Sequence, residues 1–130
     1  MTGALANGTI GSGMGLSEPI DKARHAVEIA SEKQAENIVL IDLRAASAFT
    51  DFFVVCSART PRQITAICED LDQSLSKLDI SLYHKEGTPD SGWVLMDFGD
   101  LVIHVFTAEQ RNYYQLDELW ESSPILLRVQ

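Results

Sequence analysis

Cysteine is scarce in this sequence of 130 residues, which contains only Cys56 and Cys68. Two cysteines are too few for a disulfide scaffold and lack the spacing of a metal site, which favours a reducing cytosol. No run of about 18 apolar residues occurs, so we expect no membrane-spanning segment. The histidines His25, His84 and His104 are scattered without the i, i+4 spacing of metal ligands. The sequence therefore predicts neither a disulfide-rich protein nor a metal site.

The sequence also contains few basic residues. The sequence contains ten Lys and Arg residues and 19 Asp and Glu residues, which gives a net charge of −9. Because nucleic-acid binding depends on Lys and Arg contacts to phosphates, this balance argues against binding free DNA or other nucleic acid in general. It favours a basic partner, whose association with an acidic domain would be accelerated. The alternative is that the acidity serves solubility alone.

The size and composition fit one domain with one core, since 45% of the residues are hydrophobic. Residues 1–16 carry no charge and are rich in Gly, Ser and Thr. They lack the basic region and continuous apolar core of a secretory signal, so we expect a disordered N-terminal tail. The predicted domain then covers residues 17–122, and residues 123–130 form a C-terminal tail.

The hydrophobic pattern predicts an α/β fold with a mixed five-stranded sheet and flanking helices. The first helix begins with Ser17 as its cap and ends near residues 36–37, and the second follows Thr60-Pro61. Gly99-Asp100 joins the last two strands in a tight hairpin, and short helices follow it. Residues 86–91 are predicted as a loop. The predicted strands are residues 37–43, 51–57, 80–84, 93–98 and 101–106.

The segment between Trp93 and Trp120 concentrates polar and aromatic residues within an apolar sheet pattern. Packing alone does not require such residues, so we interpret the segment as a recognition surface. The candidate partner-binding residues are Trp93, Asp97, Asp100, His104, Phe106, Arg111 and Tyr114.

Individual members of this group allow two interpretations. Trp93 begins a strand, where a large indole is expected to be partly exposed as a binding anchor or to pack at the edge of the core. His104 is either a surface residue or a core histidine satisfied by a carbonyl or carboxylate. Arg111 and the tyrosine three residues later are adjacent on a helical turn. Arg111 and Tyr114 either pin the C-terminal segment to the sheet through Asp97 or Asp100, or face a partner.

The spacing of these residues resembles the C-terminal signature of the ribosomal silencing factor family, RsfS or Iojap-like proteins. The signature residues are Trp93, Asp97, Gly99, Asp100, His104, Phe106, Arg111, Tyr114, Leu116, Leu119 and Trp120. Other blocks that match are Asp42, Thr50 to Val55, Arg62-Gln63, Ala66-Ile67 and Glu86-Gly87. The resemblance covers about residues 20 to 120. The chain departs from the family pattern in two places. Residues 58–61 stand where members usually have Gly-Thr-Ser before the arginine, and Asp117 stands where members usually have a glutamate.

The resemblance implies a fold similar to nucleotidyltransferases and a cytoplasmic homodimer. It also implies a noncatalytic factor that binds the large ribosomal subunit through its fourteenth ribosomal protein, at the subunit interface. There it would block joining of the small subunit and repress translation. Assembly of the large subunit is a related possibility, because family members in organelles act in that process.

A nucleotide-processing enzyme is the rival hypothesis that the nucleotidyltransferase-like fold invites. Nucleotidyl transfer needs carboxylates that converge on divalent cations, usually after a glycine-rich phosphate loop, and the sequence has no such loop. Asp97 and Asp100 bracket a turn, where two carboxylates do not readily share a metal. Asp70 and Asp72 lie two apart on a predicted helix and face different directions. We therefore predict no enzymatic activity, no cofactor and no metal.

Overall fold

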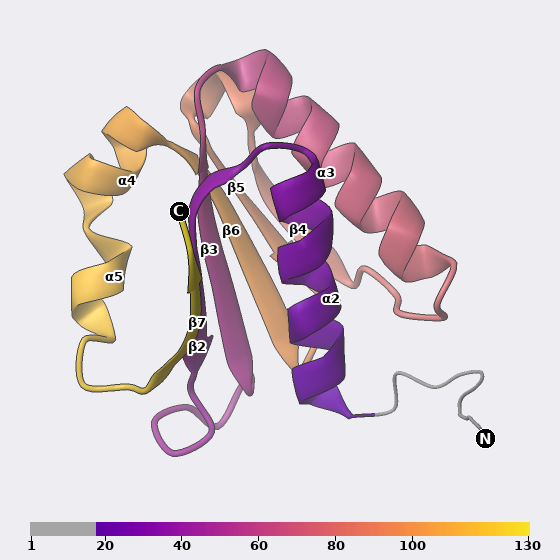
Figure 1. Ribbon diagram of the computed structural model, residues 1–130, viewed down its shortest axis with the longest axis vertical. Helices are drawn as coiled ribbons and strands as arrows, with labels where there is room; N and C mark the ends of the chain where they lie inside the picture. Colours follow the sequence, from indigo (N-terminus) through magenta and orange to yellow (C-terminus); the bar gives the residue numbers. More distant parts are fainter. Residues whose placement is uncertain (1–17) are drawn as a thin grey trace.

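The computed structural model describes residues 18–130, which form one six-stranded sheet with helices on both faces (Figure 1). The strand order is β4-β5-β6-β3-β2-β7, in which β3 and β6 pair in parallel and the other neighbours pair antiparallel. Helices α2 and α3 cover one face, and α4 and α5 lie against the other. The elements are α2 (Pro19–Glu32), β2 (Glu36–Asp42), β3 (Phe52–Ala58), α3 (Pro61–Ser76), β4 (His84–Thr88), the 3-10 helix η1 (Pro89–Ser91), β5 (Trp93–Asp97), β6 (Leu101–Thr107), α4 (Ala108–Tyr114), α5 (Leu116–Leu119) and β7 (Ile125–Val129).

Helix α2 begins with Pro19 in its first turn, as predicted, while the predicted cap Ser17 lies outside the described residues. The helix ends at Glu32, earlier than expected. Gln34 and Asn37 adopt positive φ values of 64° and 49°, which turn the chain from the helix into β2. A positive φ does not occur in a right-handed α-helix, so the helix ends before residues 36–37. Asparagine is among the few residues other than glycine that tolerate this conformation.

Helix α3 begins where its sequence predicts. The Thr60 hydroxyl accepts a hydrogen bond from the Gln63 backbone N–H at 3.1 Å, and Pro61 occupies the first turn. Five apolar residues of the helix are buried against the sheet. They are Ile64, Ile67, Cys68, Leu71 and Leu75. Leu78 is 40% exposed because the helix ends at Ser76.

The main hydrophobic core lies between the sheet and the α2–α3 layer. Strand β5 shows how the two faces divide, because Val94 and Met96 are buried in this core while Trp93, Leu95 and Asp97 alternate with them. A smaller core lies on the opposite face, beneath α4 and α5. Its buried members are Val39, Ile41, Leu43, Val55, Phe106 and Leu116, with Phe53, Trp93 and Trp120 packed against them.

The prediction of five strands is wrong, because both edge strands differ from what the sequence suggested. Residues 80–83 are not a strand, and β4 occupies His84–Thr88 within what was expected to be mostly loop. The last residues, predicted as a tail, contain β7, which pairs with β2. Each edge strand needs only one neighbour and has little buried surface, so neither carries a strong hydrophobic pattern of alternation.

Candidate functional site

The face of the sheet that α2 and α3 do not cover remains partly open over β4 and β5. Trp93, Leu95 and Asp97 point to this side and are partly buried. Their antiparallel partners on β4 include Glu86, opposite Leu95, and His84, opposite Asp97. Directly paired residues share a face of the sheet, so these exposed side chains extend the same surface. We call the surface formed by His84, Glu86, Trp93, Leu95, Asp97 and Tyr114 the open face.

An aromatic cluster holds Trp93 in place. Its ring stacks on Phe106 with ring centroids 4.8 Å apart, and it contacts Tyr114 of α4 at 4.7 Å. The indole N–H donates to Nδ1 of His104 at 3.1 Å. Since an indole nitrogen can only donate, Nδ1 must accept, and His104 carries its proton on Nε2 as a neutral ring. Phe53 packs edge-on against His104 at 4.6 Å and closes the cluster from β3.

The structure separates the predicted site residues by depth. Trp93 is partly exposed, as the sequence predicted for a residue at a strand entrance, and Tyr114 is 48% exposed. His104 is 3% exposed and Phe106 is fully buried. These two residues therefore support the indole from below and do not themselves reach the surface. His104 is a core histidine, as one interpretation held, but its partner at Nδ1 is an indole rather than a carbonyl or carboxylate.

Arg111 fastens α4 to the sheet. Its guanidinium donates to the backbone carbonyl of Asn37 at 2.6 Å and to Oγ of Ser57 at 3.0 Å. These groups belong to β2 and β3. The pinning role considered from the sequence is therefore present, while the acceptors are not the expected carboxylates of Asp97 or Asp100. The contact positions α4, and with it Tyr114 beside the indole.

The two hairpin carboxylates have different environments. Asp97 accepts a hydrogen bond from the backbone N–H of Gly99 at 2.8 Å, which stabilises the turn. Asp100 forms an ion pair of 3.2 Å with Lys22 on α2, in the opposite layer. Asp97 thus belongs to the open face, whereas Asp100 ties the hairpin to α2. This geometry gives the pair no shared ligand-binding role.

A hollow of about 220 Å³ adjoins the indole on the open face. It is lined by Glu86, Gly87, Ser91, Trp93, Leu95 and Tyr114. Trp93, Leu95 and Tyr114 give it apolar lining, and Glu86 contributes one carboxylate. Sequence reasoning missed Glu86 and Leu95 as site residues. The Glu86-Gly87 pair was noticed as a family element, and its pairing with β5 could have placed it beside Trp93.

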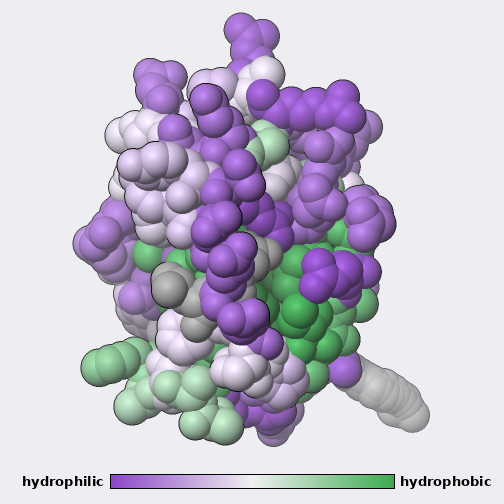
Figure 2. Space-filling view, turned by 90° about the vertical axis from the view of Figure 1, so that its left-hand side faces the viewer, coloured by the Kyte–Doolittle hydropathy of each residue, from purple (hydrophilic) through white to green (hydrophobic). Residues whose placement is uncertain are grey.

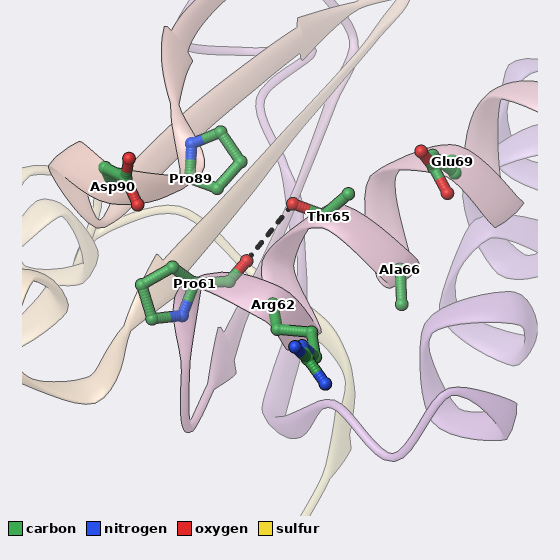
Figure 3. Close-up of a pocket in the computed structure, with 7 residues that line it drawn as sticks. All are labelled: Pro61, Arg62, Thr65, Ala66, Glu69, Pro89 and Asp90. Atoms are coloured by element: carbon green, nitrogen blue, oxygen red, sulfur yellow. Dashed lines mark hydrogen bonds between the residues drawn. The ribbon is translucent and has the colours of Figure 1, made fainter.

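A second hollow lies at the start of α3, where it meets η1 (Figure 3). Arg62 and Glu69 on the helix and Asp90 on η1 line it together with apolar atoms. The Thr65 hydroxyl donates to the carbonyl of Pro61 at 3.2 Å, within the helix itself. Its charges are of mixed sign and its mouth is open. Nothing in this arrangement assembles a catalytic group.

The two cysteines are buried core residues. Burial raises the pKa of the Cys56 thiol to about 12 and that of Cys68 to about 11. Nucleophilic catalysis requires the thiolate, which is scarce at neutral pH with such values. Among residues 18–130, no group of three or more His, Cys, Asp or Glu side chains could hold a metal ion. In the same part of the chain, no helix has the length and apolar character to cross a membrane.

Comparisons with known proteins agree with the resemblance seen in the sequence. A Ribosomal silencing factor RsfS from Halalkalibacterium halodurans is 35% identical over 99 residues, covering 76% of this chain and 85% of the relative. The mouse protein named "Mitochondrial assembly of ribosomal large subunit protein 1" is 31% identical over 97 residues, covering 72% of this chain and 42% of its own length. A crystal structure of a Chromobacterium violaceum protein superposes with a TM-score of 0.77 at 25% identity, covering 80% of this chain and 87% of that one.

The family profile described as "Ribosomal silencing factor during starvation" matches residues 17–129, which include every helix and strand of the structure. The match extends through β7, past residue 122, where the predicted domain ended. This chain therefore belongs to the ribosomal silencing factor family.

Proposed function

We propose that this protein silences ribosomes by binding the large subunit, through its fourteenth ribosomal protein, on the side that meets the small subunit. Occupying that site blocks joining of the small subunit and represses translation in the cytoplasm. The observation that carries the proposal is the immobilised indole of Trp93, which is partly exposed beside a hollow on the open face. Family membership supplies the ribosomal context.

Trp93 has the properties of a binding anchor. Aromatic residues that are rigid before binding lose little conformational entropy in the complex, and they are enriched among residues that dominate interface energies. The hydrogen bond to His104 and the stack on Phe106 fix the ring in advance. Leu95 and Tyr114 extend the apolar contact, while the hollow between them can receive a partner side chain.

Charge favours a basic protein as the partner. The chain carries a net charge of −9, and Glu86 and Asp97 place two carboxylates on the open face around the indole. An acidic surface is repelled by bare RNA phosphates and attracted to a basic ribosomal protein. The rim charges are expected to raise the association rate more than the final affinity.

The proposed mechanism requires only that the bound protein occupies space on the large subunit, and it involves no catalysed reaction. With the open face docked, the α2–α3 layer lies on the far side of the sheet and projects away from the bound protein (Figure 1). A small subunit approaching that region would collide with it. Repression then depends only on occupancy, so it follows the concentration of the protein and its affinity for the large subunit.

The direct test uses purified large subunits. The protein is incubated with them, small subunits are added, and sedimentation separates joined ribosomes from free subunits. We expect co-sedimentation with the large subunit and fewer joined ribosomes as the protein concentration rises. Binding without any loss of joining would refute the silencing mechanism, and absence of binding would refute the whole proposal.

Large-subunit assembly is the second candidate, favoured by the printed name of the mouse relative. The same open face would then hold an immature subunit until later factors bind. Depleting the protein distinguishes the two roles. Silencing predicts normal large-subunit precursors and excess joined ribosomes under starvation, whereas an assembly role predicts accumulation of incomplete large subunits during growth.

A nucleotide-processing enzyme with a nucleotidyltransferase-like fold is the rival from another class. Asp97 and Asp100 do not converge, and the described residues hold no cluster of metal ligands. We expect calorimetry with ATP or CTP and Mg²⁺ to show no binding. Micromolar affinity accompanied by turnover would favour the enzyme instead.

The proposal includes the homodimer that family resemblance implies. Light scattering at high micromolar concentration should give about twice the mass of one chain. A single species with the monomer mass throughout would remove this part of the proposal and leave ribosome binding intact.

A further inference from the structure

The chain passes from β4 to β5 through η1, and this turn borders the hollow beside Trp93. Gly87 and Ser91 line that hollow together with the indole. We call residues 87–93 the η1 corner. The backbone N–H of Ser91 donates to the Thr88 hydroxyl, and the backbone N–H of Thr88 donates to the Ser91 hydroxyl, both at 3.3 Å. These reciprocal hydrogen bonds form a capping box, which defines the conformation of the corner.

The Ser91 hydroxyl connects the corner to Trp93. It donates to the carbonyl of Thr88 at 2.7 Å, and the carbonyl of Trp93 lies 3.2 Å from it as a second acceptor. Thr88 and Trp93 are also paired across β4 and β5. The side chain of Ser91 thus ties the first residue of β5 to the last residue of β4. The backbone from which the indole extends is therefore held by contacts to both strands.

Gly87 packs against the same carbonyl of Trp93. It has a φ of 84°, a conformation that favours glycine, and a Cβ atom at this position would lie 2.1 Å from the Trp93 oxygen. Cβ atoms essentially never approach another heavy atom within 3.0 Å, so a side chain would have to move one of the two strands by about 0.9 Å, from 2.1 to 3.0 Å. The atom that it meets belongs to the backbone and cannot rotate away. The missing side chain at residue 87 therefore allows β4 and β5 to approach each other where the indole begins.

The corner also reaches the other wall of the hollow, which is formed by Tyr114 of α4. The Gly92 carbonyl accepts a hydrogen bond from the Thr107 N–H at 2.9 Å, and the Thr107 hydroxyl caps α4 by accepting from the Gln110 N–H at 3.3 Å. Helix α4 has only seven residues and none of them is fully buried. Figure 2 shows a largely hydrophilic surface over α4 and α5. The position of α4 therefore depends on specific contacts such as this cap and the hydrogen bonds of Arg111.

We propose that Gly87 and Ser91 are positioning residues for the partner contact. Through the corner they set the place of the Trp93 indole and, by way of α4, that of the Tyr114 ring. Neither residue needs to contact the partner itself. The hydrogen bond from the indole N–H to His104 measures 3.1 Å, and such bonds are lost beyond about 3.5 Å. The displacement of β5 that a side chain at residue 87 demands would break this bond or turn the ring, and either change alters the hollow that receives the partner.

The first test compares two glycines of similar conformation. Gly99 has a φ of 93°, but the atom nearest to an added Cβ is 3.0 Å away in the Tyr83 ring, an exposed side chain that can move. Gly87→Ala and Gly99→Ala therefore strain the backbone alike, and only Gly87→Ala displaces β5. After circular dichroism confirms folding, we expect Gly87→Ala to weaken binding to purified large subunits about tenfold or more and Gly99→Ala to leave it unchanged. Equal affinities of the two variants, whether kept or lost, would overturn the proposal.

Tryptophan fluorescence reports the position of the indole without any partner. The experiment uses a Trp120→Phe background, which keeps a ring at that position and leaves Trp93 as the single tryptophan. We expect Gly87→Ala to shift the emission to longer wavelength and to increase quenching by acrylamide, because the ring loses its contact with His104. Gly99→Ala should match the parent. A purely structural role would lower the stability of Gly87→Ala and leave the spectrum of the folded protein unchanged, and that result would overturn the proposal.

A milder substitution keeps the test decisive if Gly87→Ala does not fold. Ser91→Ala removes the hydroxyl that joins Thr88 to Trp93 and introduces no clash, so binding to large subunits should weaken roughly threefold. Ser91→Thr retains a hydroxyl and should bind as tightly as the parent. Unchanged affinity in Ser91→Ala, or an equal loss in Ser91→Thr, would contradict the positioning role of Ser91.

This inference rests on the proposed function, and the two can fail separately. If the parent chain does not bind large subunits, the silencing proposal fails, and the fluorescence comparison still decides whether the corner sets the indole. If the parent, Gly87→Ala and Gly99→Ala all bind equally well, the silencing proposal stands and the positioning role is wrong.

Discussion

Trp93 and His104 are joined by a hydrogen bond of 3.1 Å from the indole N–H to the imidazole Nδ1, across adjacent strands β5 and β6. The bond connects a partly exposed ring to a buried one. Without it, the indole would keep its stack on Phe106 but lose the contact that fixes its orientation. The buried histidine is therefore expected to affect partner binding although it does not reach the surface.

The first prediction concerns the hydrogen bond by which His104 holds the indole of Trp93. His104→Phe keeps a ring in the cluster but removes the acceptor of the indole N–H. A lost hydrogen bond of this kind costs about 1 kcal/mol, so large-subunit affinity should fall about fivefold. Tryptophan fluorescence, to which both Trp93 and Trp120 contribute, should also become less polarised. His25→Phe on α2 is the control, and an equal loss of affinity in that variant would contradict the role assigned to His104.

The second prediction concerns Arg111. Arg111→Ala removes donors to Asn37 and Ser57 and should lower the free energy of unfolding by about 1.5–3 kcal/mol, because hydrogen bonds from charged groups are the stronger ones. Urea denaturation measures the change. The matched control is Arg59→Ala, which breaks an exposed ion pair with Glu36 and should change stability little. Similar small effects in both variants would show that Arg111 does not fasten α4.

A third prediction follows from the buried thiol of Cys56, whose pKa burial raises from 9.0 to about 12. Folding favours the protonated thiol, so this stabilisation is complete below pH 9 and is lost as the pH rises toward 12. Stability should therefore fall across this window. Cys56→Ala should show a shallower fall in alkaline denaturation curves, after correction for its lower stability at pH 7. Parallel curves for parent and variant would contradict the assigned burial effect.

Much of the fold follows directly from the sequence. Continuous apolar runs predicted β2 and β3, and Thr60-Pro61 correctly marked the start of α3. The edge strands did not follow. His84–Thr88 is polar and contains a glycine, so its pattern is that of a loop, and only pairing with β5 makes it a strand. β7 is likewise determined by its contact with β2.

The sequence predicted that Trp93 would be partly exposed in the candidate site, but it did not predict which other site residues are buried. Sequence position alone indicated that Trp93 would be partly exposed, since it begins a strand after a turn. Whether His104 or Phe106 reached the surface depended on α4 covering that part of the sheet, which no local pattern specifies. The acceptors of Arg111 are equally nonlocal, because Asn37 is 74 residues away in the chain.

The central claim is that Trp93 anchors the ribosomal contact, and affinity for purified large subunits tests it most directly. Trp93→Ala should weaken binding by about 2 kcal/mol or more, roughly thirtyfold. Phe49→Ala truncates a ring that is 93% exposed outside the site and should bind normally. The charged residues should act differently from the indole. Asp100→Asn should alter mainly the association rate and its salt dependence, and less strongly than Glu86→Gln on the open face.

All variants are first shown to be folded by circular dichroism, because Trp93 also packs on Phe106 and Tyr114. Affinity is then measured at low and moderate salt. The account predicts a large loss for Trp93→Ala at both salt concentrations and none for Phe49→Ala. If folded Trp93→Ala binds large subunits as tightly as the parent, the indole is only a packing residue and the proposed docking surface is wrong.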